Sequence, residues 1–267
     1  MACVFQSYHK HQFMSDELFF DQSKYENYIK NRHTMVEFSE TERHFLPEII
    51  PQCRSILEVG AGAGGLYSAL KENFSHFSYC GVEYDPKLTA FAKEKYPEAT
   101  FQSGDFLGLD FENNFFDVSI CYGLLFELPN YRDFIRRMVQ LSRKYILIDV
   151  RLRYEGATTI DIDTSYVFYH SSGRRMHYIA FNVFEFLNFL QTEELQIKKV
   201  SAIGAYPHRT TSAHLPFPRG KMVVAVFLLE KFQKDETPKR KNHTSQSEVD
   251  RFCELDLNLP DFEQTQI

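Results

Sequence analysis

The sequence contains no tryptophan and few cysteines, and both scarcities limit what the protein can be. None of the 267 residues is Trp, whereas 26 are Phe and 15 are Tyr, so we expect a core rich in phenylalanine. The cysteines are odd in number and widely spaced, at Cys3, Cys53, Cys80, Cys121 and Cys253. They have neither the spacing of paired metal ligands nor the pattern of a disulfide framework. We therefore expect a protein of a reducing compartment.

Long apolar runs and a secretory leader are also missing. No stretch of about 18 apolar residues is available to span a bilayer. The first residues, MACVFQSYHKHQF, lack an apolar segment followed by a small-residue cleavage site. We therefore expect a cytoplasmic protein without membrane contact.

An excess of positive charge is absent as well. Lys and Arg number 30 against 36 Asp and Glu, which gives a net charge of −6. Because affinity for a phosphate backbone depends on cations that displace counterions, nucleic acid is a disfavoured partner. A local basic groove stays open as an alternative. The apolar share of 43% is enough for a sizeable core.

The chain divides into three parts by composition. Residues 1–50 are polar with aromatic residues at helical spacing, which predicts a helical lid or extension. Residues 51–232 alternate short apolar runs with helical segments, as in an α/β domain with a parallel sheet. Residues 233–267 are predicted to be a mostly disordered tail with at most one short helix.

The central part predicts seven strands and four helices. The strands are expected at Ser55–Val59, Ser78–Glu83, Ala99–Gln102, Val118–Tyr122, Tyr145–Val150, Gln196–Gly204 and Met222–Glu230. The helices are expected at Gly64–Asn73, Pro86–Tyr96, Tyr131–Leu141 and Val183–Leu190. A loop without helical pattern joins the last two strands, so these strands are expected to be antiparallel. A second long loop, between Val150 and Asn182, is rich in polar residues and is expected to be functional.

The sharpest local signal is ILEVGAGAGG at residues 56–65. An apolar strand runs into a glycine turn that opens a helix, so backbone N–H groups are available to a ligand. Gly60, Gly62 and Gly65 also satisfy the dinucleotide fingerprint, and Glu83 ends the next strand as that fingerprint expects. The turn alone therefore does not choose between cofactors.

Three further features favour S-adenosylmethionine. Glu58 is an acid inside the strand, where a dinucleotide-binding strand is normally apolar, and a cofactor with a cationic end would give it a partner. Asp105 and Phe106 follow the third strand, where they could hold an adenine. Tyr122 lies at the carboxyl end of the fourth strand, where ligands bind in open α/β sheets.

The segments ILEVGAGAGG, GVEYDPKL, SGDFL and FFDVSICYGLLFEL resemble, in order and spacing, the motifs of class I S-adenosylmethionine-dependent methyltransferases. The resemblance covers roughly residues 50–230. It implies an α/β, Rossmann-like class I methyltransferase fold with a seven-stranded, mostly parallel sheet in the order 3-2-1-4-5-7-6 and an antiparallel last strand. The cofactor-binding residues that it implies, together with the turn, are Glu58, Gly60, Ala61, Gly62, Glu83, Tyr84, Asp105, Phe106 and Tyr122. Glu58 and the glycines would hold the methionine end, Glu83 the ribose, Tyr84, Asp105 and Phe106 the adenine, and Tyr122 would lie near the methyl group.

Absent motifs narrow the methyl acceptor. Cys121-Tyr122-Gly123-Leu124 stands where amino-directed methyltransferases carry Asn/Asp-Pro-Pro-Tyr/Phe, and no Pro-Cys pair supplies a cytosine-directed thiol. A small-molecule acceptor remains, more favourably methylated on oxygen than on nitrogen or carbon. A hydroxyl acceptor needs a base, and His177 and His208 are the preferred candidates because each is close to an apolar element.

Two other functions stay open. A flavin- or NAD-dependent oxidoreductase would use the same glycine turn, and a binding protein of the same fold would lack catalysis. No metal site is predicted, since the Asp-x-Asp of Asp161 and Asp163 is common in loops. The sequence leaves the oligomeric state undecided.

Overall fold

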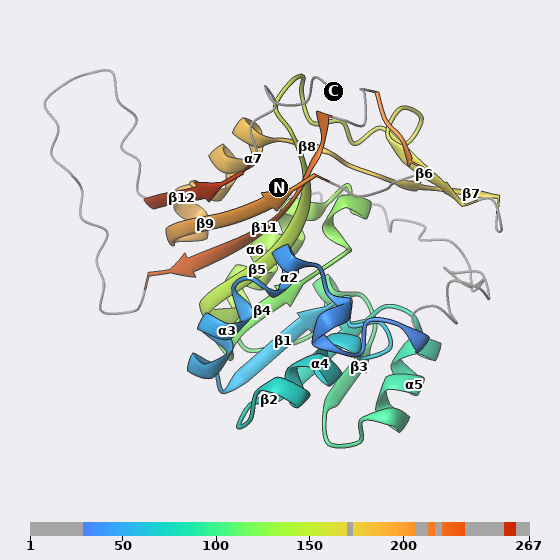
Figure 1. Cartoon of the computed structure of the whole chain (residues 1–267), viewed down its shortest axis with the longest axis vertical. Coiled ribbons are helices and arrows are strands. Elements are labelled where there is room, and N and C mark those ends of the chain that lie inside the picture. Colours follow the sequence, from blue (N-terminus) through green and yellow to red (C-terminus); the bar gives the residue numbers. More distant parts are fainter. Residues whose placement is uncertain (1–28, 170–172, 207–212, 217–220, 233–253, 260–267) are drawn as a thin grey trace, which may run out of the picture.

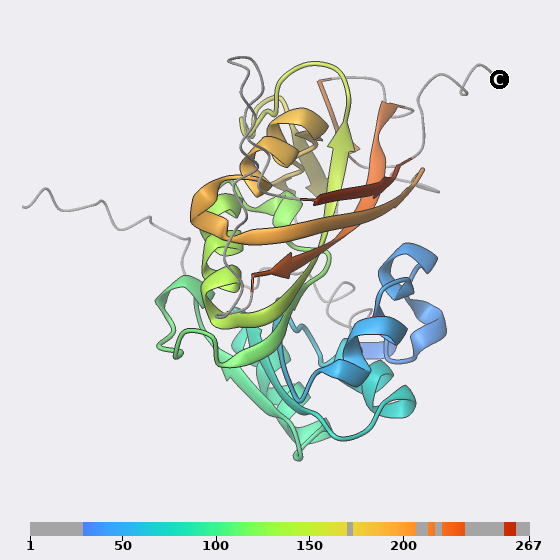
Figure 2. The ribbon, with the colours of Figure 1, turned by 90° about the vertical axis from the view of Figure 1, so that its left-hand side faces the viewer.

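The structure is a computed structural model that describes residues 29–169, 173–206, 213–216, 221–232 and 254–259 (Figure 1). A large sheet crosses the molecule, with helices on both of its faces (Figure 2). Within the described residues, no helix combines the length and the apolar composition needed to cross a bilayer.

Seven strands of the large sheet follow the predicted order. They are β1 (Ser55–Val59), β2 (Ser78–Glu83), β3 (Thr100–Ser103), β4 (Phe116–Cys121), β5 (Ser142–Arg153), β9 (Ile197–Ala205) and β11 (Val223–Lys231). Their order is β9-β11-β5-β4-β1-β2-β3, and β11 is antiparallel to both β5 and β9. The predicted Rossmann-like class I methyltransferase fold is confirmed. Every residue of β1 and β4 is buried, because both faces of a parallel sheet are covered.

Two further strands correct the predicted strand count from seven to nine. β8 (Phe181–Asn182) pairs with the end of β5, and β12 (Glu254–Asn258) pairs in parallel with β9 at the edge of the sheet. β12 belongs to the segment for which a disordered tail with at most a short helix was expected. Its sequence ELDLN alternates acidic and apolar residues, and the edge of β9 offers unpaired backbone groups to such a strand.

The predicted helices are present within one residue at each end. They are α4 (Gly65–Asn73), α5 (Pro86–Lys95), α6 (Tyr131–Leu141) and α7 (Val183–Leu190). Asp85 accepts hydrogen bonds from Lys87 and Leu88 at the start of α5, and Asn182 caps α7 in the same way. Short polar caps therefore set where α5 and α7 begin.

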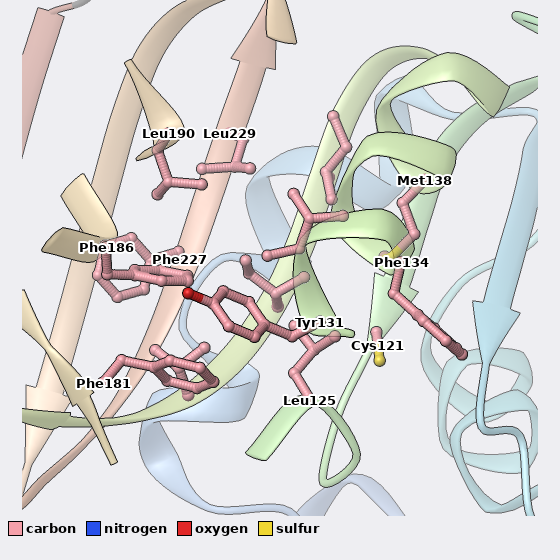
Figure 3. Close-up of a cluster of buried hydrophobic side chains, with 14 of the residues drawn as sticks. Cys121, Leu125, Tyr131, Phe134, Met138, Phe181, Phe186, Leu190, Phe227 and Leu229 are labelled. Carbon is pink, nitrogen blue, oxygen red and sulfur yellow. The ribbon is translucent and has the colours of Figure 1, made fainter. Parts of the chain in front are cut away.

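The core is rich in aromatic rings, as the composition predicts. Tyr131 of α6 lies among phenylalanines of α7, β8 and β11 (Figure 3). Its ring centroid is 4.5 Å from that of Phe181, and the rings of Phe186 and Phe227 are 5.3 Å apart. Cys121 is buried in the same cluster.

The segment before β1 packs on the opposite face of the sheet from α6 and α7 (Figure 2). It consists of η1 (Met35–Glu37), α2 (Glu40–Arg43), α3 (Leu46–Ile49) and η2 (Ile50–Gln52). Phe45, Leu46 and Ile49 bury their side chains there. The earlier part of the predicted lid, residues 1–28, lies outside the described residues.

The long polar segment after β5 has structure of its own. A second sheet of three strands has the order β10-β6-β7, with β6 at Tyr166–Tyr169, β7 at Arg174–His177 and β10 at Ala213–His214. β10 comes from the loop between β9 and β11, for which no element was predicted. The small sheet lies on the side toward which β1 points (Figure 1).

Candidate functional site

The glycine turn after β1 leads directly into α4. Gly60, Gly62 and Gly64 have φ angles of 81°, 52° and 79°, a region that favours glycine. The N–H groups of Gly60 and Ala61 both donate to the carbonyl of Val82, at 2.8 and 3.0 Å. The end of β2 therefore fixes the turn, and glycine is required at every second position.

Glu83 ends β2 beside this turn. Its Oε2 accepts from the N–H of Gly62 at 2.8 Å, and its Oε1 accepts from the N–H of Asp85 at 2.9 Å. The residue is half-buried, and burial raises the pKa of its carboxyl group. The acid expected to hold ribose hydroxyls is thus adjacent to the glycine turn.

Glu58 is buried in β1, and its carboxyl group accepts a hydrogen bond from the hydroxyl of Tyr79. Burial raises the pKa of this carboxyl to about 8, a shift that the nearby Arg32 partly opposes. Burial therefore favours the protonated form of Glu58. Its closest described partner is a tyrosine of β2, a contact that sequence reasoning did not anticipate.

The residues expected around an adenine divide into exposed and buried ones. Tyr84 follows β2 with 48% of its surface exposed. Asp105 is exposed and accepts from the N–H of Leu107 at 3.1 Å, which caps the short helix η3 (Phe106–Gly108). The side chain of Phe106 is instead buried in the core, 5.5 Å from the ring of Phe134. The Phe106 ring, which was expected to pack against an adenine, thus contributes to the core.

The end of β4 lies against the glycine turn. A Cβ atom on Gly60 would be 3.0 Å from Cδ2 of Leu124. The adjacent Tyr122 is buried, and its hydroxyl donates to the carbonyl of Glu42 at 3.0 Å. The side chain expected near the methyl group thus anchors the segment before β1.

A buried ion pair supports the same edge of the sheet. Oδ1 of Asp149 accepts from the N–H of Gly123 at 2.5 Å, and its Oδ2 lies 2.7 Å from Nη1 of Arg151. The guanidinium carbon of Arg151 lies 4.2 Å from the ring centroid of Phe126. The guanidinium group also donates a hydrogen bond to the side chain of Tyr178. The pair therefore joins β5 to the turn after β4 and to the segment after β7. Within the described residues, no cluster of His, Cys, Asp or Glu has the grouping of a metal site.

The two candidate bases differ in what the structure shows. His177 ends β7, and its Nδ1 is buried without a hydrogen-bond partner among the described residues. Burial lowers the pKa of its imidazole, an effect that Asp161 partly opposes. Burial thus favours the neutral form of His177, and Nδ1 is its unpartnered ring nitrogen. His208 lies outside the described residues.

Sequence reasoning missed one group of residues near His177. The ring centroids of Tyr166 and His214 are 4.7 Å apart and their planes differ by 19°. Tyr166 received no role, although the aromatic and β-branched residues of Tyr166–Tyr169 are typical of a strand. Its pairing with His177 is a feature of the register, which the sequence does not give.

Comparison with known proteins supports the interpretation of the fold. Residues 56–145 match the family described as a methyltransferase domain. This match spans the glycine turn and the strands β1 to β4, so this part of the chain is similar to methyltransferase domains. The ribosomal RNA small subunit methyltransferase A of Chlorobium phaeobacteroides is 36% identical over 75 residues, which are 26% of this chain and 27% of that protein. The chain thus matches only about a quarter of this curated relative's length.

Solved structures of methyltransferase fold align over most of this chain. The O-methyltransferase of a trans-AT PKS multienzyme of Brevibacillus brevis, in complex with S-adenosyl-L-homocysteine, is 15% identical with a TM-score of 0.56, and 74% of each chain is covered. The [4+2]-cyclase SpnF is 14% identical with a TM-score of 0.51, covering 67% of this chain and 76% of that one. These similarities show the fold alone, since proteins that carry out different reactions share it.

Proposed function

We propose that the protein transfers a methyl group from S-adenosylmethionine to a hydroxyl group of a small molecule. The observation that carries this proposal is the position of Glu83 beside Gly62 at the carboxyl edge of the sheet. A carboxylate at that position, next to a turn of alternating glycines, suits a ligand with a ribose and a polar tail.

The residues around the turn fit this cofactor. Glu83 would accept from ribose hydroxyls, Tyr84 has an exposed ring that an adenine could stack on, and Asp105 could accept from the adenine amino group. Gly60 and Gly62 keep the turn free of side chains, so a ligand can approach the backbone. Phe106 would contribute through its backbone, since its side chain is in the core.

Methyl transfer to a hydroxyl group requires that the acceptor oxygen be aligned with the methyl carbon and that a base accept the hydroxyl proton. When bound, the cofactor supplies a methyl carbon to which the acceptor oxygen bonds while the carbon–sulfur bond breaks, leaving S-adenosylhomocysteine. His177 would take the hydroxyl proton at its buried Nδ1 and later release it to solvent. The pKa of His177 is lowered by burial, so the neutral form needed for this step is available at neutral pH.

Methylation of ribosomal RNA is the second candidate, because the curated relative from Chlorobium carries that activity in its name. Two observations favour a small acceptor instead. The net charge is −6, which weakens binding to a phosphate backbone. The turn after β4 also carries Tyr122-Gly123-Leu124 in place of the Pro-Pro sequence of amino-directed methyltransferases.

Cofactor binding is tested by thermal-shift titration of the full chain with S-adenosylmethionine, S-adenosylhomocysteine, NAD and FAD. A ligand at about 100 times its Kd adds roughly 2.7 kcal/mol to the unfolding free energy, so Tm should rise by several degrees. We expect this rise with the two sulfur compounds only. The Glu83→Ala variant should lose at least about tenfold in affinity, or 1.4 kcal/mol, whereas Glu72→Ala on the exposed side of α4 should bind normally. A rise with NAD or FAD alone would contradict the proposal.

The reaction itself is tested with labelled S-adenosylmethionine and panels of hydroxyl compounds, amines and ribosomal RNA. His177→Gln should keep cofactor affinity while methyl transfer to the hydroxyl acceptor falls by about 10²–10⁴, the usual contribution of a positioned base. Transfer to ribosomal RNA alone would establish the second candidate.

A further inference from the structure

The backbone of Arg32 has an unusual conformation beside the start of α4. Its φ angle is 65°, a left-handed value that residues with a side chain seldom adopt. Its carbonyl oxygen lies against Gly65, where a Cβ atom would be only 2.3 Å away. Conformations of this kind persist where the surrounding structure fixes them, and they cluster at ligand-binding sites. The place of Arg32 next to the glycine turn therefore depends on its own backbone and on the absence of a side chain at residue 65.

The guanidinium group of Arg32 has hydrogen-bond donors to spare. Nη2 donates to Oε1 of Glu42, a buried acid of α2, and the guanidinium carbon lies 4.6 Å from the ring centroid of Phe38. Neither Nε nor Nη1 has a hydrogen-bond partner in the described part of the chain, and the side chain is 41% exposed. Because a guanidinium group has five N–H bonds in a planar fork, Arg32 can keep its pair with Glu42 and still donate to a second anion.

The neighbours of this guanidinium group belong to the carboxyl edge of the sheet. The backbone carbonyl of Glu42 accepts from the hydroxyl of Tyr122, the residue that follows β4. The charge of Arg32 also acts on Glu58 in β1, where it lowers the pKa of the carboxyl group against the effect of burial. The guanidinium group therefore lies near the ends of β1 and β4.

The proposed cofactor would have to extend toward this place. Glu83 ends β2, and Tyr84 and Asp105 follow β2 and β3, so the ribose and the adenine would lie on the side of β1 that faces these strands. Because the sheet order is β4-β1-β2-β3, the amino-acid end of the cofactor would cross the glycine turn toward β4. That end carries an ammonium group and a carboxylate. Glu58 and Glu83 can partner only the ammonium group, so the carboxylate needs a donor from elsewhere.

We propose that Arg32 binds the carboxylate at the amino-acid end of the cofactor. This inference rests on the proposed function and assigns a cofactor-binding residue outside the glycine turn. The carboxylate takes the donors that Glu42 leaves unused, and the pair with Glu42 holds the guanidinium group in place before the cofactor arrives. Arg32 thus lets the site distinguish a nucleoside that carries an amino acid from one that lacks the carboxylate.

Two ligands that differ only in the carboxylate test this assignment. They are S-adenosylhomocysteine and its decarboxylated form, in which a hydrogen atom replaces the carboxylate of the amino-acid end. Binding of each to the full chain is measured by calorimetry. We expect S-adenosylhomocysteine to bind at least about tenfold more tightly, a difference of about 1.4 kcal/mol. Equal affinities would overturn the inference.

Substitutions test whether this preference comes from Arg32. Arg32→Gln should bring the two affinities close to each other. Arg32→Lys should retain part of the preference, because lysine keeps the charge and lacks the planar fork. Arg43→Gln, which removes one positive charge from the neighbouring helix α2, is the matched control and should keep the full preference. A full preference in Arg32→Gln would overturn the assignment.

The ratio of the two affinities separates ligand binding from a structural role. If Arg32 only anchored its segment through Glu42, Arg32→Gln would weaken both ligands by the same factor and leave the ratio unchanged. Glu42→Gln removes the other charge of this pair and keeps an acceptor for the N–H of Ser39. We expect the ratio in Glu42→Gln to stay at about tenfold or more. An equal loss of the ratio in both variants would show that the ion pair, and not a contact of Arg32 with the ligand, sets the preference.

The outcomes also separate this inference from the proposed function. If both ligands bind with the same affinity, the proposed cofactor stands and the assignment of Arg32 is wrong. If neither ligand binds, the proposed function and this inference are both wrong.

Discussion

The hydroxyl of Tyr122 donates a 3.0 Å hydrogen bond to the carbonyl oxygen of Glu42. This bond joins the carboxyl end of β4 to helix α2, which comes from the segment before the sheet. The side chain of Glu42 accepts from the N–H of Ser39 at 2.8 Å and also pairs with Arg32. The segment from Arg32 to Glu42 is therefore held over the glycine turn by several polar contacts.

Removing the hydroxyl in Tyr122→Phe should loosen this attachment. The bond is buried, so the carbonyl of Glu42 loses its partner, and the unfolding free energy should fall by about 1–3 kcal/mol. Tyr145→Phe is the matched control, because the hydroxyl of Tyr145 donates to an exposed Gln52 side chain at 3.2 Å. Urea denaturation of both variants measures the difference. If both variants lose the same unfolding free energy, the buried bond to Glu42 stabilises the protein no more than the exposed bond to Gln52.

Gly65→Ala should displace the same segment from the start of α4. A Cβ atom at residue 65 would be 2.3 Å from the carbonyl oxygen of Arg32, so one of the two backbones must move. Overpacking of this kind costs about 1–3 kcal/mol, and proteolysis between residues 30 and 45 should become faster. At Gly108 a Cβ atom would meet nothing within 4 Å, so Gly108→Ala should leave both measurements unchanged.

The parallel sheet and the glycine turn were predictable because local patterns encode them. Apolar runs bounded by turns predicted β1 and β2 with the bounds that the structure shows. The helical period of the apolar residues predicted α6 at Tyr131–Leu141. Alternating glycines gave the turn, since only glycine adopts positive φ without cost. Glu83 was predicted as a ligand-binding acid because the glycine fingerprint expects an acidic residue at the end of the next strand.

Features that depend on distant contacts were not predictable. β12 becomes a strand because the edge of β9 is available, not because ELDLN is strongly apolar. The sequence placed Glu58 in the strand correctly but could not show that Tyr79 is its partner. The unpartnered Nδ1 of His177 results from packing and register, which no local pattern specifies.

Asp149→Asn should be one of the most destabilising polar substitutions. It leaves the charge of the largely buried Arg151 without its carboxylate, and breaking a buried pair in this way costs about 3–5 kcal/mol. Asp133→Asn is the control, because its pair with Arg136 is exposed and worth less than about 1 kcal/mol. Urea denaturation compares the two, and equally small losses would show that Asp149 and Arg151 do not stabilise the carboxyl edge.

Glu58 should make the protein less stable as the pH rises. In the folded state burial raises the pKa of its carboxyl from 4.5 to about 8, so the folded protein keeps a proton that the unfolded chain has lost. Because the folded state binds more protons between these two values, the unfolding free energy should decline from about pH 4.5 to about pH 8, by a few kcal/mol. Glu58→Gln keeps an acceptor for the hydroxyl of Tyr79 but cannot ionise, so its stability should be less dependent on pH over this range. Urea denaturation at pH 5, 7 and 9 compares the two proteins. Parallel profiles for both would mean that Glu58 is already ionised in the folded state at neutral pH.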